Sequence, residues 1–81
     1  MTHLEKIHKH SLDNREELSR SGRCGCFSCG TIFDAGEIEG WTDDGRTALC
    51  PYCGTDAVIG DAAGVTLDED FLNAMFTRYF Q

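Results

Sequence analysis

The amino-acid sequence predicts a small α+β fold, with a helical segment over residues 1–22, short antiparallel strands over residues 23–60 and an amphipathic helix over residues 66–80. Three observations predict it. Short β-prone runs bounded by turn residues fill the middle of the chain. Two Cys-x-x-Cys-Gly motifs lie within this middle part. Apolar residues recur at helical spacing towards the C-terminal end. A length of 81 residues fits one domain, residues 1–81.

The N-terminal segment is expected to hold two short helices. Residues 1–10 carry the basic cluster of the chain and few apolar side chains, which indicates a marginal helix. A second helix is expected over residues 11–21, because Ser11 is a suitable N-cap and Gly22 a typical C-terminal stop. The Asp13–Glu16 pair offers a rival capping box about two residues further on, so the start of this helix stays open.

The middle of the chain reads as a series of short strands. Between the second and third of these runs lies Asp43-Asp44-Gly45, and Asp-Gly supplies the positive φ angles that a tight hairpin turn needs. Short strands joined by such turns predict antiparallel pairing. The four strand-like runs are Thr31–Phe33, Ile38–Trp41, Thr47–Leu49 and Ala57–Ile59.

The clearest helix is expected over residues 66–80. It starts with a capping-box pattern, Thr66 to Glu69, and carries a broad apolar stripe that should cover the strands. Alternatively, Tyr79 and Phe80 at the end of the stripe stay exposed as a binding surface. The stripe consists of Phe71, Leu72, Met75, Phe76, Tyr79 and Phe80. The core that it should join consists of Ile32, Phe33, Ile38, Trp41, Leu49, Val58 and Ile59.

The two cysteine pairs predict a metal site made of Cys26, Cys29, Cys50 and Cys53. A Cys-x-x-Cys pair bends the backbone so that two sulfurs reach one ion, and two pairs complete a tetrahedron of thiolates around Zn²⁺. The glycine after each pair can adopt a positive φ angle, which lets backbone N–H groups turn towards the sulfurs. We therefore expect one Zn²⁺ per chain. Since protein fills all four positions, the ion should be structural.

The remaining cysteine and the histidines have weaker interpretations. Cys24 could replace Cys26 as a ligand, but the tighter spacing favours Cys26 and leaves Cys24 as a partly buried free thiol. His3, His8 and His10 lie in the weakly structured N-terminal stretch and are expected to be solvated rather than to hold a second metal.

Charge and segment composition limit the classes of partner. Fourteen acidic and seven basic side chains give a net charge of −7, and such a surface repels phosphate backbones, so nucleic acid is not an expected partner. The first six residues lack the apolar region of a signal peptide, and no apolar run is long enough to span a membrane. The protein is therefore expected in the cytoplasm, where thiols stay reduced and closely paired cysteines more often bind metal.

These residues resemble two known groups of proteins. The segments Cys26–Gly30 and Cys50–Gly54 are similar to the knuckles of zinc ribbons and rubredoxin-like proteins, and the rubredoxin resemblance implies iron and one-electron transfer in such a site. The whole chain also resembles a family of small bacterial proteins without an assigned activity, which implies a cytoplasmic setting. The second resemblance rests on His10-Ser11, Asn14–Glu17, Cys24–Phe27, Ala48–Gly54, Val58–Asp61, Phe71-Leu72 and Met75.

Three functions follow from the sequence as hypotheses. The first is a non-enzymatic zinc protein whose acidic surface or last helix binds another protein, since no set of catalytic groups is recognisable. The second is a rubredoxin-like iron electron carrier. The third, which the charge disfavours, is a nucleic-acid-binding zinc ribbon. The partner and the oligomeric state are not predicted.

Overall fold

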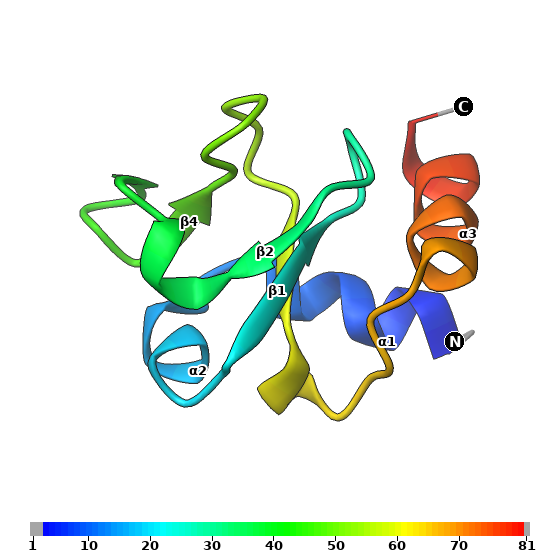
Figure 1. Cartoon of the computed structure of the whole chain (residues 1–81), viewed down its shortest axis with the longest axis horizontal. Coiled ribbons are helices and arrows are strands. Elements are labelled where there is room, and N and C mark those ends of the chain that lie inside the picture. The colour runs from blue at the N-terminus through cyan, green and yellow to red at the C-terminus, as the bar shows by residue number, and fades with distance from the viewer. Residues whose placement is uncertain (1–2, 81) are drawn as a thin grey trace.

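The small α+β fold is confirmed by a computed structural model of the chain, which describes residues 3–80 and the side chains of residues 6–80 (Figure 1). Within this range the helices are α1 (His3–His8), α2 (Arg15–Ser19) and α3 (Glu69–Tyr79). The strands are β1 (Arg23–Cys26), β2 (Ile32–Asp34), β3 (Gly40–Thr42), β4 (Thr47–Leu49) and β5 (Val58–Gly60). Short 3₁₀ turns occupy Lys9–Ser11, Ala35–Glu37 and Asp61–Ala63.

The strands form two antiparallel sheets. One has the order β2-β1-β5, and the other is the β3–β4 hairpin. The hairpin turns at Asp43, Asp44 and Gly45, which all have positive φ angles, as the sequence predicts. Each predicted strand matches one of β2 to β5, within a shift of up to two residues. Strand β1 was not predicted, because Arg-Cys-Gly-Cys has no β-branched or aromatic residue. It is stabilised by pairing on both edges.

The N-terminal segment differs from its prediction. The marginal helix is α1, followed by a 3₁₀ turn that ends at Ser11. Ser11 is therefore not the N-cap of the second helix. It is buried, and its hydroxyl donates a hydrogen bond to the His8 carbonyl at 2.7 Å. The second helix, α2, begins after Asn14 and is shorter than predicted. The buried contacts of Asn14, rather than a local capping signal, place its start.

The C-terminal helix is confirmed, but it begins later than predicted. The N-cap is Asp68, whose carboxylate accepts a hydrogen bond from the backbone N–H of Phe71 at 2.8 Å. Thr66 therefore does not cap the helix. A carboxylate at this position also stabilises the positive end of the helix dipole.

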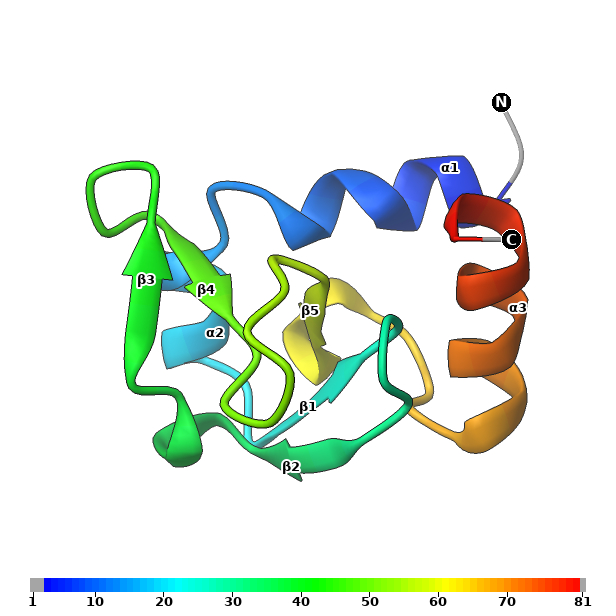
Figure 2. The ribbon, with the colours of Figure 1, turned by 90° about the horizontal axis from the view of Figure 1, so that it is seen from above.

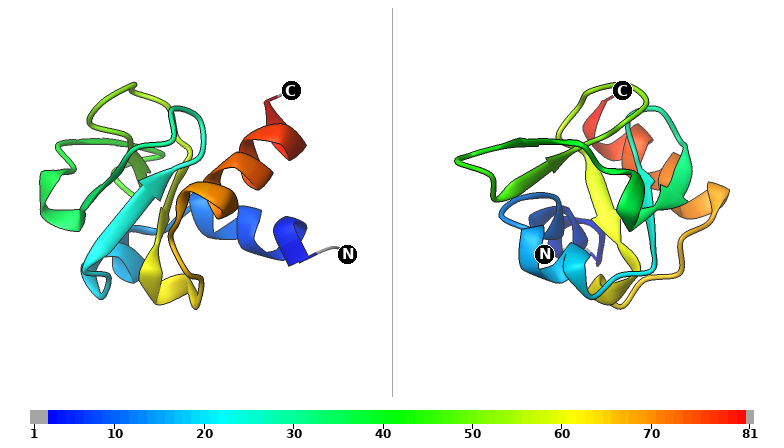
Figure 3. Two further views of the ribbon diagram at one scale, coloured as in Figure 1. Left: turned by 45° about the vertical axis from the view of Figure 1, so that its right-hand side comes forward. Right: turned by 60° about the vertical axis from the view of Figure 1, so that its left-hand side comes forward.

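Helices α3 and α2 cover opposite faces of the three-stranded sheet. A Cβ atom on Gly25 would lie 3.1 Å from the side chain of Leu72 in α3. A Cβ atom on Gly60 would lie 2.7 Å from the side chain of Leu18 in the last turn of α2. Gly60 pairs with Cys24, the residue before Gly25, so the two glycines face opposite sides. Helix α1 contacts α3 near both termini, and the β3–β4 hairpin lies at the far end of the molecule (Figures 2 and 3).

The core differs in part from the predicted one. Phe33, Val58 and Ile59 are buried as expected, together with Leu72 and Met75 of α3. The other predicted core residues, Ile32, Ile38, Trp41 and Leu49, are only partly buried. Trp41 belongs to the hairpin, far from α3, and the Arg15 guanidinium lies 4.7 Å from its ring centroid. Core residues that were not predicted include Ile7, Leu18 and Phe27.

Candidate metal centre

Two loops bring the four predicted cysteines together. The first loop begins at Cys26, the last residue of β1, carries Cys29 and leads to β2. The second, between β4 and β5, carries Cys50 and Cys53. Both loops lie at the same end of the molecule, at the top of Figure 1. The second loop is further positioned by Tyr52, whose ring lies 5.8 Å from that of Phe33 in β2, centroid to centroid.

The sulfur atoms have the spacing of a tetrahedral site. All four Sγ atoms lie within 4.8 Å of one another. Cys26 Sγ is 3.6 Å from Cys53 Sγ, and Cys29 Sγ is 3.7 Å from Cys50 Sγ. A metal ion with Zn–S bonds of about 2.3 Å requires sulfurs about 3.8 Å apart along each edge of the tetrahedron. The four sulfur atoms and their spacing therefore fit one metal ion that prefers thiolate ligands, such as Zn²⁺ or iron.

Each loop closes through the glycine that follows its second cysteine. The Gly30 N–H donates to the Cys26 carbonyl at 2.8 Å, and the Gly54 N–H donates to the Cys50 carbonyl at 2.9 Å. Both glycines have positive φ angles, 77° and 78°. Side chains rarely adopt this conformation, so the glycines are required by the turn. The predicted positive φ angles of the two glycines are confirmed, and their own N–H groups bond to carbonyl oxygens rather than to sulfur.

Backbone N–H groups face the buried sulfurs. The Tyr52 N–H donates to Cys50 Sγ at 3.4 Å. Burial raises the pKa of the Cys26 thiol, against backbone hydrogen bonds from Cys29 and Ser28 that favour its thiolate. Burial likewise raises the pKa of Cys50 against similar bonds. Such N–H groups stabilise the negative charge that a metal-bound thiolate carries.

Two threonines that the sequence analysis missed complete the surroundings of the sulfurs. Thr31 Oγ1 lies 3.3 Å from Cys29 Sγ. At Cys53, burial opposes thiolate formation, but hydrogen bonds from the side chain and backbone of Thr55 and from the neighbouring cysteines lower the pKa to about 6. The signal was present in the sequence, since both loops read Cys-x-x-Cys-Gly-Thr. In each loop the threonine hydroxyl therefore lies within hydrogen-bond distance of the second cysteine's sulfur.

The two cysteines of each pair differ in exposure. Cys26 and Cys50 are buried, with 0% and 3% of their surface exposed, whereas Cys29 and Cys53 are exposed. The first cysteine of each loop thus anchors the site in the core, and the second lies at the surface. An ion held by these four sulfurs would have no position left for a substrate or a water molecule.

Cys24 does not belong to the four-cysteine cluster. It is more buried than predicted, with none of its surface exposed, and lies in β1 opposite Phe33 and Gly60. Burial, together with the carboxylates of Asp61 and Asp34, raises the pKa of Cys24 to about 11. The thiol therefore stays protonated at neutral pH and is a poor nucleophile.

Two of the histidines are only partly exposed, because their rings contact other side chains, so the prediction that they are solvated holds in part. The His8 ring stacks on Tyr79 of α3 with ring centroids 3.9 Å apart. His10 Nδ1 lies 2.8 Å from a carboxylate oxygen of Glu17. The side chain of His3 lies outside the described part of the chain. Among the described residues, the four-cysteine cluster is the group of His, Cys, Asp and Glu side chains that could hold a metal ion.

Comparison of the chain with family models, with curated proteins and with solved structures finds no match in any of the three. The likeness to zinc-binding knuckles rests on the spacing of the four cysteine sulfurs in this structure. The resemblance of the whole chain to small bacterial proteins stays a prediction. No helix within residues 3–80 has the length and apolar character needed to cross a bilayer.

Proposed function

We propose that this chain is a non-enzymatic zinc protein whose single Zn²⁺, bound by Cys26, Cys29, Cys50 and Cys53, organises a surface for binding another protein. One observation carries the proposal: four sulfurs from two loops lie within 4.8 Å of one another. Since all four ligands come from the protein, the ion serves structure and leaves no open position for catalysis.

The position of the cluster supports a structural role. The first loop belongs to the three-stranded sheet, and the second joins the β3–β4 hairpin to β5. An ion shared by the two loops ties the hairpin to the larger sheet. A chain of 81 residues buries too little apolar surface for high stability, and a structural Zn²⁺ contributes about 10–16 kcal/mol of binding free energy in small zinc peptides.

Metal analysis and native mass spectrometry of the purified protein test the zinc site. We expect one zinc per chain, and loss of the cooperative unfolding transition after chelation. Cys26→Ala should abolish stoichiometric binding, whereas the matched control Cys24→Ala should keep it, because the Cys24 sulfur lies outside the cluster. A metal-free protein that unfolds as cooperatively as the zinc-loaded one would contradict the proposal.

An iron electron carrier is the second candidate. The exposure of Cys29 and Cys53 favours it, since an ion close to the surface can exchange electrons with a partner. Iron in this site would make the protein red. A colourless protein with stoichiometric zinc, isolated from cells supplied with iron, would rule out this candidate.

The acidic surface supports a protein partner rather than nucleic acid. At a net charge of −7, binding to a phosphate backbone would be opposed by long-range repulsion. We expect no retardation of DNA or RNA in gels at low salt. Salt-sensitive binding at micromolar protein would instead support a nucleic-acid-binding ribbon. A cytoplasmic location remains part of this proposal.

A further inference from the structure

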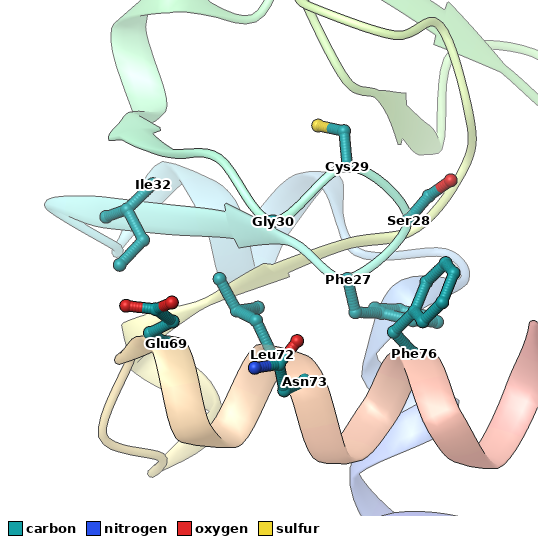
Figure 4. Close-up of a pocket in the computed structure, with 9 residues that line it drawn as sticks. All are labelled: Phe27, Ser28, Cys29, Gly30, Ile32, Glu69, Leu72, Asn73 and Phe76. Atoms are coloured by element: carbon teal, nitrogen blue, oxygen red, sulfur yellow. The ribbon is translucent and has the colours of Figure 1, made fainter.

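A groove of about 530 Å³ separates the first cysteine loop from helix α3 (Figure 4). One wall is the loop from Phe27 to Gly30, continued by Ile32 of β2, and the other is the face of α3 that carries Glu69, Leu72, Asn73 and Phe76. The Cys29 side chain points away from α3 in Figure 4, so the loop offers its backbone to the groove and its sulfur to the metal site.

One end of the groove is aromatic and accessible at Phe76, and Phe80 lies beside it outside the groove lining. Phe76 and Phe80 have 37% and 46% of their surface exposed, and their rings stack with centroids 5.9 Å apart. Phe80 also lies 5.6 Å from the buried ring of Phe27. Exposed aromatic side chains that pack against a buried one are held in a fixed position and form an apolar surface, which is typical of protein-binding sites.

The other end of the groove is acidic. Glu69 faces it beside Ile32 in Figure 4, and the exposed residues on either side of Glu69 in the sequence are Asp68 and Asp70. These carboxylates are part of the chain's net charge of −7. A ligand with a cationic side chain is therefore attracted to this end, whereas a second copy of this acidic chain is repelled.

We propose that this groove binds a short segment of a partner protein that places an apolar anchor against Phe76 and a Lys or Arg side chain beside Glu69. This inference rests on the proposed function, because it specifies the surface and the chemistry of the partner. Phe76 lies seven positions after Glu69 in α3, which is about 10 Å along the helix at 1.5 Å per residue. An extended segment covers that span in about three residues, and a helical one in about seven.

Binding should depend on the metal. The loop wall of the groove, Phe27 to Gly30, follows Cys26 directly and contains Cys29, so two of the four cysteines hold it in place. Loss of the ion would release this wall, while α3 would keep only its contacts with the sheet and α1. The ion would thus control the affinity for the partner by fixing the conformation of the loop that forms one wall of the groove.

Selection from a display library of random twelve-residue peptides tests the proposal with the zinc-loaded protein as bait. Enriched peptides are then titrated against the wild type and three variants. Phe76→Ala removes the aromatic end and Glu69→Lys reverses the acidic end. Glu39→Lys makes the same charge change at an exposed position outside the groove. Circular dichroism and zinc content show whether each variant is folded.

We expect enriched peptides to carry Lys or Arg three or seven residues from a large apolar residue. Phe76→Ala and Glu69→Lys should each weaken binding by about tenfold or more, as removal of a hot-spot contact does, while Glu39→Lys should change it less than threefold or so. NMR shifts on peptide addition should map to Ser28, Gly30 and Asn73. Chelation should abolish the interaction.

Several results would overturn the groove proposal. These are failure to enrich peptides, enrichment of acidic or uncharged ones, equal binding by Phe76→Ala, and a dimer in sedimentation that Phe76→Ala disrupts. A folded, zinc-loaded protein that gives any of them overturns the groove alone. A protein that folds and selects the expected peptides without zinc overturns the structural-metal proposal instead.

Discussion

The side chain of Asn14 joins the two sheets, and its removal should be among the most damaging changes outside the metal site. Its amide nitrogen donates to the carbonyl of Val58 in β5 at 2.9 Å and to that of His10 at 3.0 Å. Its amide oxygen accepts from the N–H of Ala48 in β4 at 3.1 Å. The residue is 2% exposed, so the amide replaces a peptide group between β4 and β5.

The expected loss follows from these three bonds. Asn14→Ala leaves the Ala48 N–H and the Val58 carbonyl buried without this partner, at about 1–3 kcal/mol each, and the His10 bond adds about 1 kcal/mol. We expect the free energy of unfolding to fall by about 3–7 kcal/mol. Asn14→Asp should lose more, since a carboxylate would face two carbonyl oxygens in a buried site.

Urea unfolding followed by circular dichroism measures this loss. Free zinc must be buffered at one concentration throughout, because a ligand that binds the folded state adds to the apparent stability. Asn73→Ala, an exposed asparagine of α3, is the matched control and should change stability by about 0.5 kcal/mol or less. A loss below about 1 kcal/mol for Asn14→Ala would refute the reasoning, because buried hydrogen bonds of this kind should cost more.

Three further predictions concern packing and the metal. Gly60→Ala places a Cβ atom 2.3 Å from Ser21 Oγ and should lower the unfolding free energy by about 1–3 kcal/mol in urea titrations, whereas Gly36→Ala, with open space around it, should be nearly neutral. Thr55→Val removes the hydroxyl that supports Cys53 and should weaken zinc affinity by about tenfold in competition with a chelator; unchanged affinity would contradict this role. Zinc should be released as the pH falls, because protons compete for the thiolates, and the protein should unfold as zinc leaves. A zinc-binding dye would measure the release and circular dichroism the unfolding. A protein that stays folded after zinc release would contradict a structural ion.

The metal loops could be predicted because their information is local. Two cysteines and a glycine within five residues dictate one turn conformation, and the structure has that conformation in both loops. The amphipathic pattern of α3 and the Asp-Gly hairpin turn are local in the same way, and both were predicted correctly apart from their end residues. The repeated threonine was equally readable and was overlooked.

Other features could not be predicted because they depend on distant residues. Strand β1 contains no β-prone residue and exists because β2 and β5 pair with it on both edges. The start of α2 is set by Asn14, whose partners lie in β4 and β5. The contact of His8 with Tyr79 joins the first helix to the last, so the histidine's surroundings were invisible from its own segment.

The sequence by itself determined the four cysteines of the candidate metal site and the apolar stripe of the last helix, since each is encoded within a few neighbouring residues. Only the tertiary structure decided that the paired sulfurs from the two loops meet at 3.6 and 3.7 Å, and that the first loop forms one wall of a groove against α3. These features arise from packing between segments far apart in the chain, where shape and burial, not local propensity, select the arrangement.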